Sequence, residues 1–157
     1  MAHVSESIEV DAPLTEVYNQ WTQFEEFPTF MDAVERVEQK DETHLRWTAN
    51  IGGRTVAWDA EVVEQEHDKA IAWRSTSGPS NSGRVRFAGH DDHAHVTLDM
   101  DVEPDTVTER AGEMLGLLQR QVRQDLERFK QLIEQRGHAS GEWRGTVREG
   151  QPSSSKL

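Results

Sequence analysis

Apolar and polar side chains alternate at the start of the chain, which predicts a strand over residues 3–10. Pro13 then fits the first turn of a helix, because its missing N–H needs no partner there. Apolar residues at helical spacing follow and predict a short amphipathic helix over residues 13–23. Residues 24–31 are rich in phenylalanine but contain Pro28, which favours a second short helical piece or a compact apolar turn.

From about residue 33 the hydrophobic period changes to two, which is typical of strands. Gly52-Gly53 separates two alternating runs and indicates a hairpin. Each run has one apolar and one polar face, which predicts an antiparallel sheet that is wet on one side and carries cross-strand ion pairs there. The apolar faces comprise Leu45, Trp47, Ala49 and Ile51; Val56, Trp58, Ala60 and Val62; Ile71 and Trp73; Val85 and Phe87; and Val96, Leu98, Met100 and Val102.

A long amphipathic helix is predicted between Thr106 and Gly137. Thr106 can cap it, with Glu109 at the spacing of a capping box. Apolar residues then recur at steps of three and four: Val107, Ala111, Met114, Leu115, Leu118, Val122, Leu126, Phe129 and Ile133. A sheet with one apolar face must cover that face, and this helix is the large partner for it. The predicted fold is therefore α+β, with the helix packed on the sheet.

The last residues, 138–157, lack such a pattern and are rich in glycine, serine and charged residues. We therefore expect one domain over residues 1–137, followed by a flexible tail. Trp143 in this segment either docks on the domain, contacts a partner or is an incidental exposed side chain. The final tripeptide, Ser155-Lys156-Leu157, matches a peroxisomal address.

Composition excludes several classes of function. The chain has 157 residues, no cysteine and a formal net charge of -12. Disulfides and cysteine-based zinc sites are excluded, and the negative charge argues against nucleic acid or an anionic membrane as partner. No apolar run is long enough to span a bilayer, so stable membrane insertion is not expected. The start of the chain lacks a secretory signal, so we expect a cytoplasmic protein, with the peroxisome as the alternative.

Four segments together resemble the polyketide cyclase/dehydrase-like branch of the START-like (SRPBCC) superfamily, to which coenzyme Q-binding proteins also belong. They are IEVDAPLTEVYNQWTQFEEFPTFM, HLRWTANIGGRTVAWDAEV, IAWRSTSGPSNSGRVRF and DLERFKQLIEQRG. The resemblance covers roughly residues 2–136 and implies a helix-grip fold with a cavity between sheet and long helix. Members bind lipids, quinones, hormones or polyketides there, so a hydrophobic small molecule is the expected partner.

Candidate ligand-binding residues are the inward-facing aromatic and apolar side chains of the strands and their neighbours. Their rings and pliable methionines suit a flat or lipid-like ligand. The alternative is that they fill the core, which is the commoner role of such residues. The set comprises Trp47, Trp58, Trp73, Phe87, Leu98, Met100, Phe30 and Met114.

Two glycine-containing features allow more than one interpretation. Gly112 and Gly116 lie one turn apart on the long helix, where each costs about 1 kcal/mol relative to alanine. They either make room for a ligand, form a hinge, or let the helix approach the sheet closely, and the last interpretation is slightly favoured. Residues 75–83 form a polar loop that either gates the cavity or is an ordinary hairpin connection.

Polar candidates for chemistry are few. The cluster from His90 to His95 is read as a solvated turn more readily than as a metal site. Glu6 and Arg54 share the phase of apolar neighbours, so each either points into the pocket with a partner or reaches water at a strand end. No nucleophile motif and no phosphate-binding glycine loop is present, so no cofactor is expected and catalytic residues cannot be named.

Three functions follow from these observations. The first is binding or transport of a lipid, quinone or polyketide-like molecule. The second is a polyketide cyclase or dehydrase, which requires a buried acid or base with a perturbed pKa in the cavity. The third is an interaction protein whose core is filled.

Overall fold

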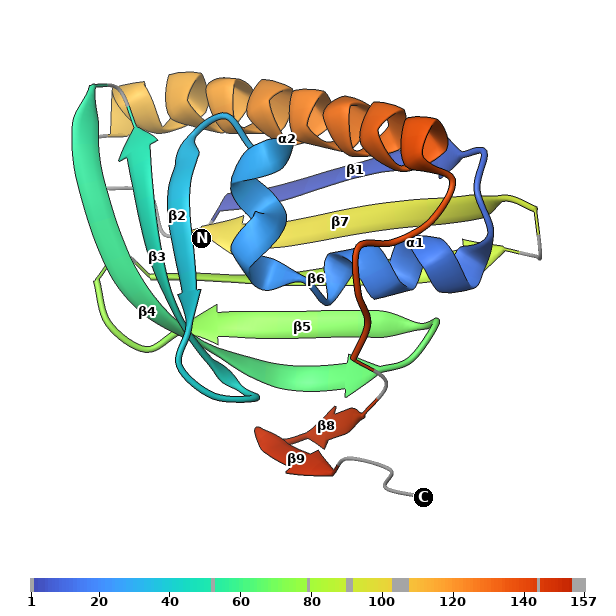
Figure 1. Ribbon diagram of the computed structural model, residues 1–157. Helices are drawn as coiled ribbons and strands as arrows, with labels where there is room; N and C mark the ends of the chain where they lie inside the picture. Colours follow the sequence, from blue (N-terminus) through green and yellow to red (C-terminus); the bar gives the residue numbers. More distant parts are fainter. Residues whose placement is uncertain are drawn as a thin grey trace.

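The strands form one open antiparallel sheet in the order β1-β7-β6-β5-β4-β3-β2. The computed structural model describes residues 2–51, 53–78, 80–89, 92–102, 108–143 and 145–153. Figure 1 shows the sheet curving beneath one long helix, so the α+β helix-grip prediction is confirmed. The strands are β1 (Ala2–Val10), β2 (Val34–Gln39), β3 (His44–Ile51), β4 (Arg54–Glu66), β5 (Ala70–Ser75), β6 (Asn81–Gly89), β7 (Ala94–Val102), β8 (Thr146–Arg148) and β9 (Gln151–Ser153).

The helices lie where the hydrophobic period of the sequence places them. The described part of the long helix is α2 (Thr108–Arg136), and the predicted cap at Thr106 lies outside the described residues. Gly137 follows α2 with a φ of 76°, and its N–H donates to the carbonyl of Ile133 at 2.8 Å. This left-handed conformation is the usual helix stop at glycine. The shorter pieces are α1 (Leu14–Trp21) and the 3-10 helix η1 (Phe24–Thr29), which contains Pro28.

Charged residues line the outer face of the sheet in pairs, as the strand pattern predicts. Arg46 contacts Asp59 at 3.0 Å, Arg74 contacts Glu61 at 3.1 Å, and Arg86 contacts Asp99 at 3.0 Å. Each arginine is largely exposed, so water and salt screen these pairs and each adds little to the stability of the fold.

Strand β2 is absent from the prediction, and an irregularity in its pairing explains why. The register with β3 shifts between Val34 and Arg36. This bulge puts the apolar residues Val34 and Val37 three apart, so the strand does not alternate along its sequence. The loop predicted at 75–83 is also shorter, because β6 already begins at Asn81.

The segment after α2 differs most from its prediction. Instead of a flexible tail, residues 138–143 and 145–153 run back across the domain and form β8 and β9 (Figure 1). Strand β8 pairs with β4 through Gln65 and Val147, and Val147 is fully buried. Trp143 packs against the core, so of its three interpretations docking on the domain is the one observed. The final tripeptide lies outside the described residues.

Candidate functional site

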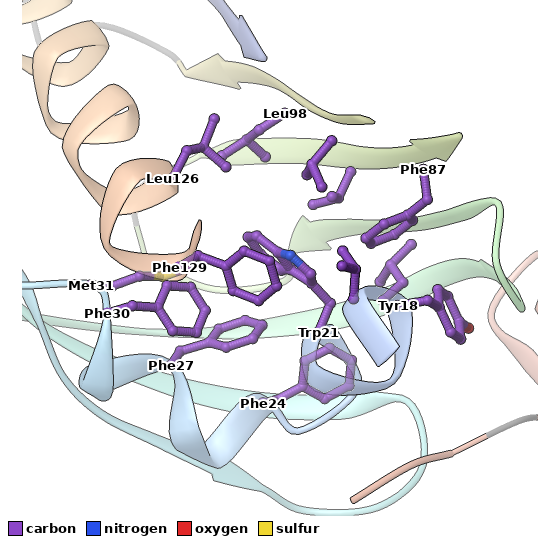
Figure 2. Packing of buried hydrophobic residues seen from close by; sticks show 14 of the residues in the cluster. Tyr18, Trp21, Phe24, Phe27, Phe30, Met31, Phe87, Leu98, Leu126 and Phe129 are labelled. Carbon is purple, nitrogen blue, oxygen red and sulfur yellow. The ribbon is translucent and has the colours of Figure 1, made fainter. Parts of the chain in front are cut away.

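The space between the sheet and α2 is the interior of the domain. The buried stripe of α2 faces it, and Figure 2 shows Leu126 opposite Leu98 of β7 and Phe129 beside Trp21 and Phe30. The buried residues of the stripe are Val122, Leu126, Phe129 and Ile133. None of the described helices is both long and apolar enough to cross a membrane.

One end of this interior is closed by a cluster of aromatic rings around Trp21. Its indole lies 5.1 Å from the ring of Phe129, 5.4 Å from that of Phe30 and 6.4 Å from that of Phe87, measured between ring centres (Figure 2). The contacts with Phe30 and Phe87 are edge-to-face and the contact with Phe129 is tilted, and such ring contacts add to the stability gained by burial. Phe30 and Phe87 were both predicted to contact a ligand, and the structure places both within this packed cluster.

The other end of the interior is less completely covered. Trp58, Trp73 and Met100, all predicted ligand contacts, are only partly buried there. Leu98 and Trp47 are buried between this end and the aromatic cluster, at 5% and 8% exposure. The side chain of Met114 lies outside the described residues. Six of the eight predicted residues are thus found on inward strand positions, grading from closed packing to partial exposure.

A stacked tryptophan pair and a glycine shape this open end. Trp47 and Trp58 are directly paired across β3 and β4, with ring centres 5.9 Å apart and planes 6° apart. Trp73 is paired with Gly83, and a Cβ on that glycine would lie 2.4 Å from the Trp73 ring. Gly83 therefore lets the indole of Trp73 lie flat on the sheet.

Two ring nitrogens in the interior have no hydrogen-bond partner among the described residues. They are Nε1 of Trp21 and Nε1 of Trp47, and both are buried. A buried N–H without an acceptor costs about 1–3 kcal/mol. The Trp47 nitrogen belongs to the ring that stacks on Trp58, a side chain that is only partly buried.

Asp125 is a partly buried acid that sequence analysis did not select. Its carboxylate accepts from Nε2 of Gln121 at 2.9 Å and contacts Arg128 at 3.3 Å, and Arg128 also pairs with Asp32 at 2.8 Å. Burial raises the pKa of Asp125 from 3.8 to about 6, against the opposing effect of Gln121. The available signal was its place four residues before Phe129, next to the apolar stripe.

Glu6 is satisfied by α2. Its carboxylate accepts from Nε of Arg123 and from Nε2 of Gln119, at 2.9 and 2.8 Å. The hydrogen bond from Arg123 is the main reason why the pKa of Glu6 lies below its ordinary value. Of the two interpretations of Glu6, the one with a partner is observed, and the pair fixes α2 to β1. The side chain of Arg54 lies outside the described residues.

Two histidines of the predicted cluster each pair with a carboxylate. His93 contacts Asp92 and His95 contacts Glu9. No group of three or more possible metal ligands occurs within the described part of the chain, which does not include His90 and Asp91.

Gly116 does not mark a close approach of helix to sheet. It is exposed, and a Cβ built on it would meet nothing within 4 Å. The interpretation that these glycines let the helix approach the sheet closely is therefore wrong at Gly116. The surroundings of Gly112 lie outside the described residues, so the interpretation is not tested there.

Loop residues 76–78 are held on β4 by two hydrogen bonds to Asp59. The Thr76 N–H donates to the Asp59 carbonyl at 2.7 Å, and the Ser77 hydroxyl donates to the Asp59 carboxylate at 2.8 Å.

A curved antiparallel sheet that holds a long C-terminal helix over its apolar face is the helix-grip fold. The chain belongs to the polyketide cyclase/dehydrase and lipid transport family, whose model matches residues 10–131. It is 48% identical over 149 residues to an uncharacterized 17.2 kDa protein of Streptomyces lincolnensis, a match that covers 94% of this chain and 99% of that protein.

Two solved structures are similar in fold. The Zhui aromatase/cyclase of a Streptomyces species has a TM-score of 0.74 at 20% identity, covering 90% of this chain and 98% of that one. A START superfamily protein of Mycobacterium smegmatis has a TM-score of 0.68 at 18% identity, covering 83% of this chain and 98% of that one. At these identities the likeness concerns the fold.

Proposed function

We propose that this protein binds a hydrophobic small molecule between the sheet and α2, at the end marked by Trp58, Trp73 and Met100. The observation that carries the proposal is the grading of the interior, from a closed aromatic cluster to apolar side chains that are only partly buried. A ligand that covers these side chains removes apolar surface from water, with a gain near 25 cal/mol per Å² before the costs of association.

The chemistry of this end narrows the ligand to an apolar molecule with one oxygen acceptor. The stacked pair of Trp47 and Trp58 presents flat aromatic surface, and Trp47 Nε1 is a buried donor without a partner among the described residues. A quinone or polyketide carbonyl, or a fatty-acid carboxylate, supplies both the apolar surface and the acceptor.

A screen of quinones, fatty acids and aromatic polyketides by thermal shift tests this proposal, followed by titration of tryptophan fluorescence. A true ligand should stabilise the fold by about 2.7 kcal/mol when its free concentration is 100 times the dissociation constant. Trp58→Ala should weaken binding at least about tenfold, and Trp143→Ala, on the far side of the domain, should weaken it less. Equal effects of the two variants, or no ligand in the screen, would contradict the proposal and favour an interaction protein with a filled core.

Asp125 supports a second candidate, a cyclase or dehydrase. A carboxyl group with a pKa raised to about 6 is in part protonated near neutral pH and can act as a general acid. In a dehydration it would give its proton to a leaving hydroxyl while the substrate loses its α-proton to a base.

The test is the dehydration of a β-hydroxy ketone followed by ultraviolet absorbance. The enzyme hypothesis expects a rate that falls as the pH rises through about 6 and that is lost in Asp125→Asn. A wild-type rate equal to that of buffer would exclude this candidate and leave ligand binding as the function.

A further inference from the structure

A cavity of about 230 Å³ lies outside the space between the sheet and α2. It is formed where the C-terminal segment crosses the junction of α1 and η1 and the end of β4. Its wall includes Thr22, Phe24, Gln65 and Trp143, with Glu42 and Glu142 beside them. Thr22 and Phe24 are buried, Trp143 is half-buried, and both glutamates are exposed. The cavity therefore has a buried floor and an acidic mouth.

Gln65 is the polar group of this floor. It is 1% exposed, and neither its Oε1 nor its Nε2 has a hydrogen-bond partner among the described residues. It points inward because the register of β4 with β5 shifts between Val62 and Glu64, which moves the next inward position to Gln65. A buried amide with both atoms unsatisfied is unfavourable unless something in the cavity bonds to it.

The neighbouring polar groups are already engaged, so the wall is preformed. The Thr22 hydroxyl donates to the carbonyl of Asn19 and accepts both from Nε2 of Gln23, at 2.9 Å, and from the N–H of Trp143, at 3.1 Å. The Trp143 ring lies over Gly145, where a Cβ would come within 2.4 Å of it. Glycine at 145 thus lets the indole lie flat, while Thr22 fixes its backbone.

The charges favour a cation. Glu42 and Glu142 carry carboxylates, and no lysine or arginine occurs among the described residues of the wall. Gln65 offers one donor and one acceptor, which suits a hydroxyl group, and Trp143 and Phe24 offer apolar ring surface. We propose that this cavity binds a small hydroxylated cation of the amino-sugar class, with its hydroxyl groups on Gln65, its apolar face on Trp143 and its ammonium group near the two glutamates.

Glucosamine is the probe, with glucose as the uncharged control. NMR of the full-length protein follows the side-chain amide of Gln65 and the indole N–H of Trp143, assigned with Gln65→Leu and Trp143→Phe. Glucosamine should shift both signals in a saturable manner at millimolar concentration. Glucose should bind about fivefold more weakly, as expected for the loss of one exposed ion pair.

Three variants separate this site from its alternatives. Gln65→Leu should keep or raise the melting temperature, since it removes an unsatisfied amide, and should abolish glucosamine binding. Glu142→Gln should weaken binding about fivefold, whereas Glu127→Gln, an exposed glutamate on α2, should leave it unchanged. Glucosamine that shifts neither signal, or a cavity that holds only ordered water on Gln65, overturns the proposal. Equal binding of glucose and glucosamine overturns the role of the two carboxylates and with it the amino-sugar class.

Discussion

Trp21 and Phe129 join the three parts of the fold that close the aromatic end of the interior. Trp21 ends α1, Phe30 follows η1, and Phe129 comes from α2, yet their rings lie within 5.5 Å of one another. Phe129 is fully buried. Each ring therefore fixes the position of an element that is distant in the sequence, and its loss affects more than its own transfer free energy.

Phe129→Ala should lower the free energy of unfolding by about 3–5 kcal/mol, because it removes a buried ring and leaves a cavity among rigid neighbours. Leu117→Ala is the matched control on the same helix, since Leu117 is 63% exposed, and it should change stability by less than about 0.5 kcal/mol. Urea denaturation measures both values. A nearly neutral Phe129→Ala would place this face of α2 in solvent.

Asp125 makes a contribution to stability that depends on pH. Its folded pKa, about 6, is above the ordinary value of 3.8, so its neutral form is the one that the fold favours. This contribution is complete below pH 4 and is lost as the pH rises through 6, to a total of about 3 kcal/mol. Asp125→Asn should match the wild type near pH 4 and exceed it above pH 6. Parallel stability curves from pH 4 to 7 would show that the carboxyl group is not desolvated.

At the scale of elements, the end of β4 changes neighbours. Strand β3 pairs with β4 as far as Glu61, and beyond that point β8 occupies the same side of β4 at Glu64 and Gln65. The turn between β8 and β9 adds a bond from the Gly150 N–H to the Val63 carbonyl at 3.1 Å. The C-terminal segment therefore continues the sheet beyond the point where the pairing of β3 with β4 ends.

Gly116 offers a simple test of the described part of α2. A Cβ at this position meets nothing, and alanine favours a helix over glycine by about 1 kcal/mol. Gly116→Ala should therefore raise the free energy of unfolding by about that amount in urea denaturation. A loss of stability, or unchanged stability with altered ligand binding, would instead indicate that the glycine serves as a hinge.

At the scale of the whole molecule, the local pattern predicted most elements and missed those that depend on distant partners. The α2 stripe was clear because its apolar residues recur every three or four positions. Strand β8 has only Val147 as a buried apolar residue, so no periodicity can reveal it. Asp125 lies near Asp32, which follows η1, and the burial of Gln65 depends on a bulge in β4. A local window of sequence encodes neither arrangement.

Removal of residues 138–157 tests whether the C-terminal segment belongs to the domain. Truncation removes the buried Val147 and the packing of Trp143, so we expect a loss of at least about 2 kcal/mol in urea denaturation. Removal of residues 154–157 alone keeps every described contact and should leave stability unchanged. If the longer truncation also has the same free energy of unfolding as the full chain, a domain boundary at residue 137 is correct after all.

The pairing of β8 with β4 also bears on how copies of this protein behave at high concentration. Without β8, the backbone groups near residues 64 and 65 that now face β8 would form an unpaired strand edge, beside the apolar surface that Val147 now covers. Such an edge is a template for intermolecular strand pairing. We therefore expect the C-terminal segment to protect the protein against aggregation. Its removal should produce oligomers whose amount rises with protein concentration, as measured by light scattering, at temperatures where the rest of the domain is still folded.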